Sequence, residues 1–101
     1  MPACNEVTIK QAEELLREQS ILVLDRRDSQ SYQQGHIDGA MMAHDGLIES
    51  IINKRELDRP ILVYCYRGND SKELAGMLSS LGYQQVYSLS GGFAEWKRCH
   101  A

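Results

Sequence analysis

The sequence has 101 residues, 43% of them hydrophobic, which suits one compact domain (residues 1–101) with a single core. A formal net charge of −3 leaves no basic stripe to neutralise phosphates, so we expect no nucleic-acid partner. No apolar run approaches the ~20 residues that span a bilayer, and the N-terminus lacks the pattern of a signal peptide. We therefore expect no membrane segment and a cytoplasmic protein.

The first half of the sequence alternates between helical and strand-like patterns. Residues 8–11 spell a capping box, and apolar residues then recur on one helical face. The apolar run at 21–24 ends at Asp25 and predicts a strand buried on both faces. Residues 28–34 predict a short helix and residues 40–43 a short strand. The apolar spacing over 47–52 then predicts a helix that ends before Pro60.

The second half continues the alternation. Residues 61–64 predict a strand, and residues 70–73 can cap a helix that Gly82 ends. The apolar face of this helix comprises Leu74, Ala75, Met77, Leu78 and Leu81. A strand at 86–89 and a terminal helix entered through a Gly-Gly turn follow. Strands that alternate with helices predict an α/β fold, with a mostly parallel sheet of about five strands and helices on both faces.

Cys65 stands where the strand at 61–64 ends and the next helix is about to begin. Reactive groups of parallel sheets gather at the carboxyl ends of the strands. A loop that curls into a helix N-terminus can point backbone N–H groups and a partial positive charge at the thiol, which lowers its pKa. Gly68 would relax the curvature and Asn69 would tolerate left-handed geometry, while Arg67 adds a permanent positive charge. We expect a nucleophilic thiolate.

The other cysteines lack such surroundings. The chain has three cysteines and no C-x-x-C pair, a pattern that favours neither a disulfide scaffold nor a zinc site. His44 and His100 have no partner at ligand spacing, so we expect no metal. Free cysteines are often only small buried hydrophobic residues, and we interpret Cys4 and Cys99 as non-catalytic.

Three motifs resemble those of the rhodanese family, in particular its small single-domain thiosulfate sulfurtransferases. The stretch VLDRRDSQSYQQGHIDGA (23–40) is similar to the family's N-terminal signature, and SGGFAEW (90–96) is similar to its C-terminal one. CYRGNDS (65–71) stands where the family carries its active loop, with Cys65 as the persulfide-forming cysteine. The three motifs occur in the family's order and spacing and cover nearly the whole chain.

The resemblance implies a ping-pong sulfur transfer through a Cys65 persulfide, without metal or organic cofactor. Thiosulfate or another persulfide would be the donor. Cyanide or a thiol would be the acceptor, and a sulfur-carrier or thioredoxin-like protein is a further candidate partner. The backbone N–H groups of the loop would hold the transferred sulfur, and Arg67 would attract the anionic donor. The substrate-binding loop so implied consists of Tyr66, Arg67, Gly68, Asn69, Asp70 and Ser71.

Other motif residues are better interpreted as scaffold. An ion pair between Asp25 and Arg27 would tie a buried strand to its loop. His36 is expected to hydrogen-bond within its turn, since an ionised thiolate needs no general base. Phe93 and Trp96 have the spacing of core residues on a helix.

Three competing functions remain open at this stage. Cysteine phosphatases and arsenate reductases carry an Arg six residues after the nucleophile, but here that residue is Ser71. A non-catalytic rhodanese-like module used for binding or regulation would usually lack the cysteine, which this chain keeps, and a sulfur-relay module that takes sulfur from a protein persulfide is the related alternative. A redox sensor would need a resolving cysteine, and only Cys99 could approach. Asp70 would oppose a dianionic donor if it faced inward, so we expect it to cap the helix amides instead.

Overall fold

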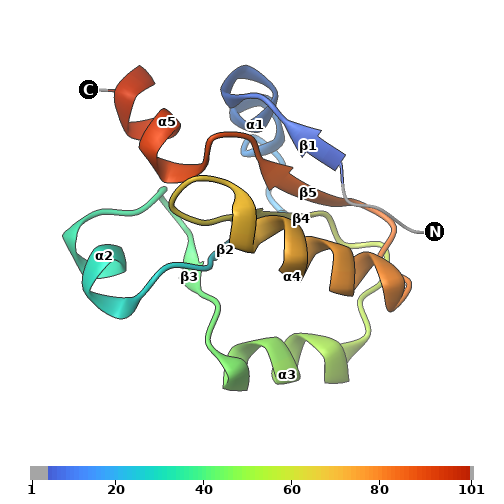
Figure 1. Cartoon of the computed structure of the whole chain (residues 1–101). Coiled ribbons are helices and arrows are strands. Elements are labelled where there is room, and N and C mark those ends of the chain that lie inside the picture. The colour runs from blue at the N-terminus through green and yellow to red at the C-terminus, as the bar shows by residue number, and fades with distance from the viewer. Residues whose placement is uncertain (1–4, 101) are drawn as a thin grey trace.

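The computed structural model describes residues 5–100, so the prediction for Cys4 lies outside the described residues. Its ten elements follow in chain order (Figure 1): β1 (Asn5–Val7), α1 (Ile9–Leu15), β2 (Leu22–Asp25), α2 (Ser29–Gln34), β3 (Met41–Met42), α3 (Asp45–Lys54), β4 (Ile61–Tyr64), α4 (Asn69–Ser80), β5 (Val86–Leu89) and α5 (Gly92–Cys99). The five strands form one sheet in the order β1-β5-β4-β2-β3, and every neighbouring pair is parallel.

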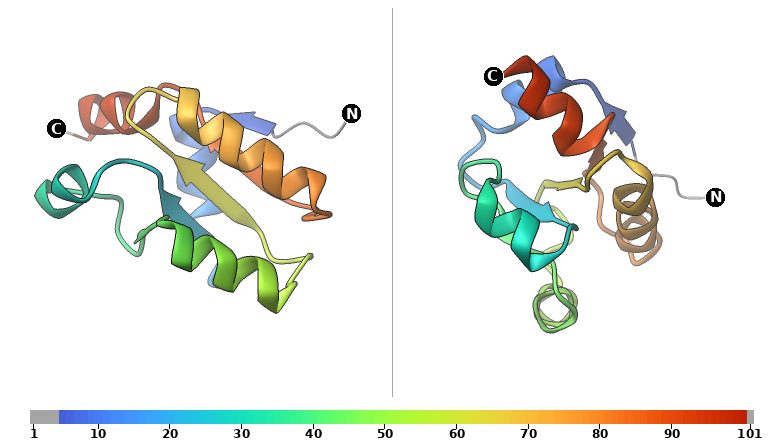
Figure 2. Two further views of the ribbon diagram at one scale, coloured as in Figure 1. Left: turned by 60° about the horizontal axis from the view of Figure 1, so that its bottom comes forward. Right: turned by 60° about the vertical axis from the view of Figure 1, so that its left-hand side comes forward.

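The sheet is covered by helices on both faces (Figure 2), which confirms the predicted α/β fold. One core cluster packs α3 and α4 against β2, β4 and β5, and it includes Leu24, Ile48, Val63 and Leu78. The second cluster packs α1 and α5 against the other face and includes Ala12, Leu62 and Leu89. β2 and β4 are buried along their whole lengths, because they lie inside the sheet and face a helix layer on each side.

Local sequence signals explain where several helices begin. The predicted capping box is present: Gln11 N donates to Thr8 Oγ1 at 3.2 Å, and Thr8 N donates to Gln11 Oε1 at 2.9 Å. Asp28 caps α2 through Ser31 N, and His44 caps α3 through Leu47 N. No metal role was expected for His44, and the structure shows that its side chain caps a helix instead.

Two expectations were wrong, and one strand was missed. The missed strand is β1, because this edge strand has one buried residue and offers little apolar pattern. Asp70 does not cap α4: the N-cap is Gly68, and no side chain hydrogen-bonds there. On α4, Met77 and Leu81 are 41% and 42% exposed, so only Leu74, Ala75 and Leu78 of the predicted apolar face are buried.

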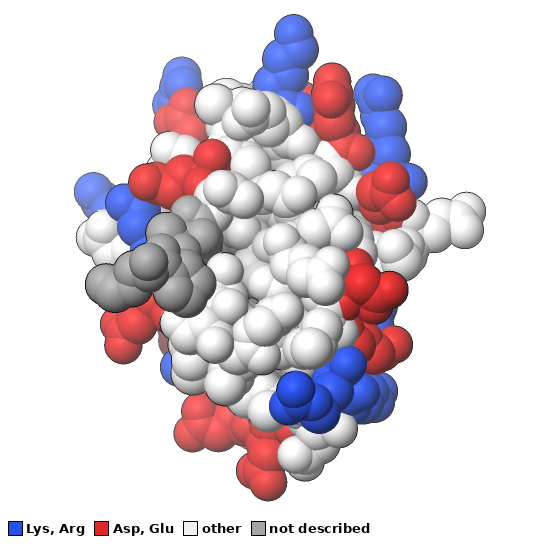
Figure 3. Space-filling model, turned by 90° about the vertical axis from the view of Figure 1, so that its right-hand side faces the viewer, with Lys and Arg blue, Asp and Glu red and all other residues white. Residues whose placement is uncertain are grey.

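Charged side chains are spread around the molecule. On the face at the right of Figure 1, residues of both signs surround a broad uncharged area (Figure 3). Within residues 5–100, no helix has the length and apolar character needed to cross a bilayer.

Candidate active site

Cys65 follows β4 directly, in the middle of the sheet and at the carboxyl ends of its strands. The residue is 3% exposed. Gly68 N donates a hydrogen bond to the Cys65 sulfur at 3.0 Å. The hydroxyl of Ser71, in the first turn of α4, is hydrogen-bonded to the same sulfur at 3.5 Å. The Gly68 N–H donates to the sulfur, and the thiol is placed as the donor toward the Ser71 hydroxyl, which can donate to the sulfur once the thiol is ionised.

The surroundings of Cys65 favour the thiolate. Burial raises the pKa of the thiol, but hydrogen bonds from the Ser71 side chain and from the backbone N–H groups of Ser71, Gly68 and Arg67 lower it. The net effect is a pKa below the ordinary value of a cysteine. A thiol with a lowered pKa is ionised to a greater extent at a given pH, and the thiolate is the nucleophilic form.

Ser88 extends this arrangement below the loop. Its hydroxyl lies on β5, is 1% exposed and is 2.8 Å from the Ser71 hydroxyl. Ser71 is itself fully buried, and either hydroxyl of this pair can be the donor, so Ser88 can donate to Ser71 when Ser71 donates to the sulfur. No local pattern points to Ser88, since it occurs inside a strand-like run and seventeen residues after Ser71.

The loop geometry depends on Gly68 rather than on Asn69. Gly68 has φ of 103°, in the left-handed region that favours glycine. Within residues 5–100, Arg55 is the only residue other than glycine that has a positive φ. Asn69 is the first residue of α4 and has no positive φ, so its tolerance of left-handed geometry is not used here.

The N-terminus of α5 holds the other side of the loop. Phe93 N donates to the Cys65 carbonyl at 2.8 Å, and Ala94 N donates to the Tyr66 carbonyl at 3.0 Å. A Cβ atom on Gly92 would lie 2.5 Å from the first carbonyl oxygen and 2.6 Å from the second, so only glycine allows this approach. With these carbonyls fixed on α5, the following N–H groups are free to face the sulfur.

A buried polar network supports β4 just before the nucleophile. Tyr64 Oη donates to Asp25 Oδ2 at 2.6 Å, and Arg27 Nη2 forms an ion pair with the same oxygen at 2.7 Å. Arg27 Nη2 also donates to the Gly35 carbonyl at 2.6 Å, and its guanidinium lies 4.1 Å from the centroid of the Phe93 ring. The predicted scaffold role of the Asp25–Arg27 pair is confirmed.

The remaining predicted residues lie around this centre. Tyr66 and Arg67 are exposed beside Cys65, with the Arg67 guanidinium 5.9 Å from the Tyr66 ring centroid. His36 Nδ1 is 2.8 Å from the Tyr32 carbonyl, which confirms its turn contact. Cys99 is exposed at the far end of α5, roughly 10 Å along the helix axis from Gly92 at 1.5 Å per residue. Cys65 and Cys99 are both free thiols.

No metal centre was expected from the sequence. Within residues 5–100, no group of three or more His, Cys, Asp and Glu side chains is placed to bind a metal ion.

Known proteins share these features. The model of the rhodanese-like domain matches residues 8–99. Thiosulfate sulfurtransferase GlpE of Pseudoalteromonas translucida is 35% identical over 98% of this chain and 94% of its own. The GlpE protein of Pseudomonas fluorescens SBW25 is 45% identical over 81% of this chain and 75% of its own. The rhodanese-like domain of the Anabaena protein Alr3790 has a TM-score of 0.79 at 30% identity, covering 93% of this chain and 74% of that one. The chain belongs to the rhodanese-like domain family.

Proposed function

We propose that this protein is a sulfurtransferase that moves a sulfane sulfur from thiosulfate to a thiol or cyanide acceptor through a persulfide on Cys65. The observation that carries the proposal is the position of the Cys65 sulfur, which is buried and accepts a hydrogen bond from the Gly68 N–H at the N-terminus of α4. The names of the curated relatives support thiosulfate as donor.

In the first half-reaction, the Cys65 thiolate attacks the outer sulfur of thiosulfate. A bond forms between Sγ and that sulfur, and the S–S bond of thiosulfate breaks. Sulfite leaves with the electron pair, and Cys65 becomes a persulfide anion. The negative charge of the persulfide replaces that of the thiolate among the same hydrogen-bond donors. The same electrostatic field therefore stabilises the thiolate and the persulfide.

In the second half-reaction, an acceptor nucleophile attacks the terminal sulfur of the persulfide and restores the thiolate. Backbone N–H groups from Tyr66 to Ser71 would bind the terminal sulfur before transfer. Arg67, exposed beside the nucleophile, would attract the dianionic donor. No step calls on a metal or organic cofactor.

Intact mass after treatment with thiosulfate tests this proposal. We expect the reduced protein to gain about 32 Da, one sulfur atom, as for cysteine persulfidation. Cyanide should reverse the gain and produce thiocyanate. Cys65→Ser should show no gain, whereas Cys99→Ser, at the exposed free cysteine, should behave like the parent protein. A parent protein without the gain would rule out thiosulfate as the donor.

The competing functions predict different results. A cysteine phosphatase would need a guanidinium where Ser71 stands. A sulfur-relay module would take sulfur only from a protein persulfide, so loading by a cysteine-desulfurase persulfide without loading by thiosulfate would identify it. A disulfide-based redox sensor is disfavoured, because Cys99 lies at the opposite end of α5 from the active loop.

A further inference from the structure

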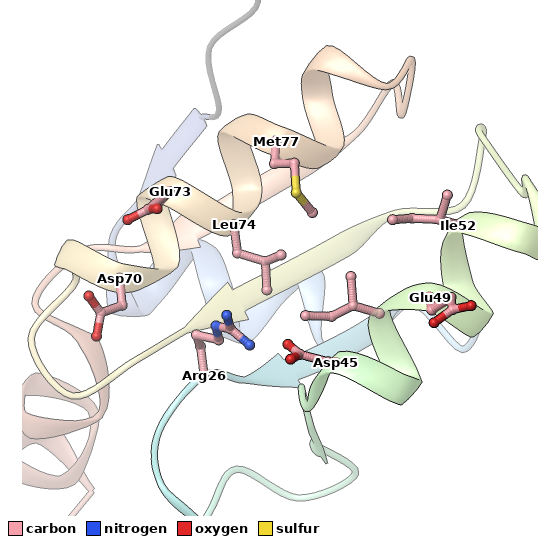
Figure 4. Close-up of a pocket in the computed structure, with 9 residues that line it drawn as sticks. Arg26, Asp45, Glu49, Ile52, Asp70, Glu73, Leu74 and Met77 are labelled. Atoms are coloured by element: carbon pink, nitrogen blue, oxygen red, sulfur yellow. The ribbon is translucent and has the colours of Figure 1, made fainter.

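A groove of about 670 Å³ runs between α3 and α4 on one face of the sheet (Figure 4). Its floor is apolar, and Met77 at its side is 41% exposed. The apolar lining residues are Ile48, Ile52, Leu74 and Met77. An exposed methionine beside aliphatic residues can repack around different side chains, which suits a surface that binds a partner.

Four carboxylates line the same groove, two from each helix: Asp45 and Glu49 from α3, and Asp70 and Glu73 from α4. Arg26 is the one cationic lining residue, and its Nη1 donates to the Ala43 carbonyl at 2.6 Å. Within residues 5–100, none of the four carboxylates takes part in an ion pair. The groove therefore has a negative rim, because its four carboxylates outnumber its one cationic side chain.

One end of the groove lies beside the nucleophile. Asp70 is five residues after Cys65, in the first turn of α4, and does not cap the helix. Arg26 N donates at 2.7 Å to the carbonyl of Tyr64, the residue before Cys65. Figure 4 shows Asp70 and Arg26 near the active loop, with Met77 and Ile52 farther along the groove. A molecule lying in the groove would thus end close to the active loop, at Asp70 and Arg26.

We propose that the groove between α3 and α4 binds a basic, amphipathic segment of the protein thiol that accepts sulfur from Cys65. This inference rests on the proposed function and names its acceptor class. Apolar side chains of the segment would cover the floor, and its Lys or Arg residues would face the carboxylates. A small anion gains nothing from either feature, whereas a cationic protein surface is attracted by both.

The transfer step balances without a further reactant. The acceptor thiol attacks the terminal sulfur of the Cys65 persulfide anion. The bond between that sulfur and Cys65 Sγ breaks, and its electron pair remains on Sγ as the thiolate. The proton of the acceptor thiol ends on the new acceptor persulfide.

Two synthetic peptides test the acceptor class. Both carry one cysteine and the same leucines, but one has lysines where the other has glutamates. Protein loaded with sulfur from thiosulfate is mixed with each peptide, and sulfur transfer is followed by mass. We expect transfer to the lysine peptide to be at least tenfold faster at low salt, and the difference to shrink as salt screens the charges. Equal rates would overturn the inference.

Matched variants locate the effect. Glu49→Gln with Glu73→Gln should remove most of the preference for the lysine peptide, while sulfur loading and transfer to cyanide stay unchanged. Glu14→Gln with Glu18→Gln, two exposed residues of α1 and the turn after it, should keep the preference. The inference fails if both double variants lose it or if neither does.

A separate measurement distinguishes failure of the chemistry from failure of docking. Binding of the fluorescently labelled lysine peptide is measured on Cys65→Ser, which cannot carry sulfur. If thiosulfate fails to load the parent protein but the peptide binds and Glu49→Gln/Glu73→Gln weakens it, the proposed donor is wrong and the docking site stands. If loading succeeds but the lysine peptide binds no better than the glutamate peptide, the docking site is wrong.

Discussion

The N-termini of α4 and α5 make use of the same local structure in two different ways. Each follows a central strand, each has a left-handed glycine as N-cap, Gly68 or Gly91, and neither cap supplies a side-chain hydrogen bond. At α4 an N–H group faces the Cys65 sulfur, whereas at α5 the N–H groups bind the carbonyls of Cys65 and Tyr66. Unsatisfied helix N–H groups can thus stabilise a reactive anion in one place and fix a loop in another.

The two ends depend on each other. Because α5 binds the carbonyl side of the loop, the peptide planes that follow present their N–H side to the sulfur. If the α4 N-terminus supports the proposed chemistry, we therefore expect it to do so only while the α5 N-terminus holds the loop. Substitutions at the N-terminus of α5 should reveal the anchoring of the loop. Substitutions at the N-terminus of α4 should reveal the electrostatic stabilisation of the sulfur.

The largest effect is expected from Gly92→Ala. The new Cβ would lie 2.5 Å from the Cys65 carbonyl oxygen, and the residue would keep a positive φ of 62°. We expect a loss of about 2–4 kcal/mol in the free energy of unfolding, from overpacking and backbone strain, with loss of sulfur loading. Urea denaturation measures the free energy of unfolding, and the mass assay measures sulfur loading.

Gly76→Ala is the matched control for that substitution. Gly76 lies inside α4, and a Cβ there would meet no heavy atom within 4 Å. This variant should be stabilised by about 0.5–1 kcal/mol and should load sulfur normally. If Gly92→Ala were as stable and active as Gly76→Ala, the anchoring role of α5 would be wrong.

Ser71→Ala tests the electrostatic stabilisation of the Cys65 thiolate at the N-terminus of α4. Loss of this hydroxyl should raise the pKa of Cys65, because the Ser71 hydrogen bond lowers it. A hydrogen bond to a charged group is worth about 1.5–3 kcal/mol, so iodoacetamide alkylation at neutral pH should slow roughly tenfold. The pH at which alkylation is half-maximal should move upward, with Ser80→Ala on the exposed side of α4 as the control.

The same substitution has a consequence for stability against pH. A thiol with a lowered folded pKa stabilises the folded protein above its unfolded pKa, and this contribution is lost as the pH falls through the folded pKa. Ser71→Ala should therefore gain less stability than the parent protein when the pH is raised across that window. Urea denaturation at a series of pH values measures the difference.

Ser88→Ala should shift Cys65 alkylation in the same direction but less, by roughly threefold in rate, since Ser88 acts only through the 2.8 Å contact with Ser71. Ser88→Thr keeps a hydroxyl and should recover most of the rate. An unchanged pH profile in Ser88→Ala would show that Ser71 is oriented without it.

The smallest effect is expected at the far end of α5, where His100 Nε2 lies 2.9 Å from Glu13 Oε2. Hydrogen bonds with the Trp96 carbonyl and with Glu13 raise the pKa of His100. In Glu13→Gln, NMR titration should show a lower His100 pKa, and Cys65 alkylation should be unchanged. The stabilisation from this pair is present at low pH and is lost as the pH rises through the folded pKa of His100. A change in Cys65 reactivity would mean that α5 is not held by its N-terminus alone.

Most of the fold could be predicted from sequence patterns, since buried strands such as 61–64 and capped helices have strong local signals. The position of Cys65 at the carboxyl end of β4 followed from the same patterns. Other features could not be predicted, because they depend on contacts between distant segments. The Ser71–Ser88 contact and the close approach of Gly92 to the loop are of this kind. Asp70 was misplaced because its residue type suits an N-cap, although the N-cap is Gly68, two residues earlier, and the helix begins at Asn69.

The bonds from Phe93 and Ala94 to the loop also set an order of maturation. During synthesis, residues 65–71 emerge well before residues 92–94, which hold the Cys65 and Tyr66 carbonyls. Until that later segment folds, Cys65 resembles any other thiol of an unfinished chain. In the proposed function, the hydrogen bonds that order the Cys65 loop can thus form only after residues 92–94 have been made.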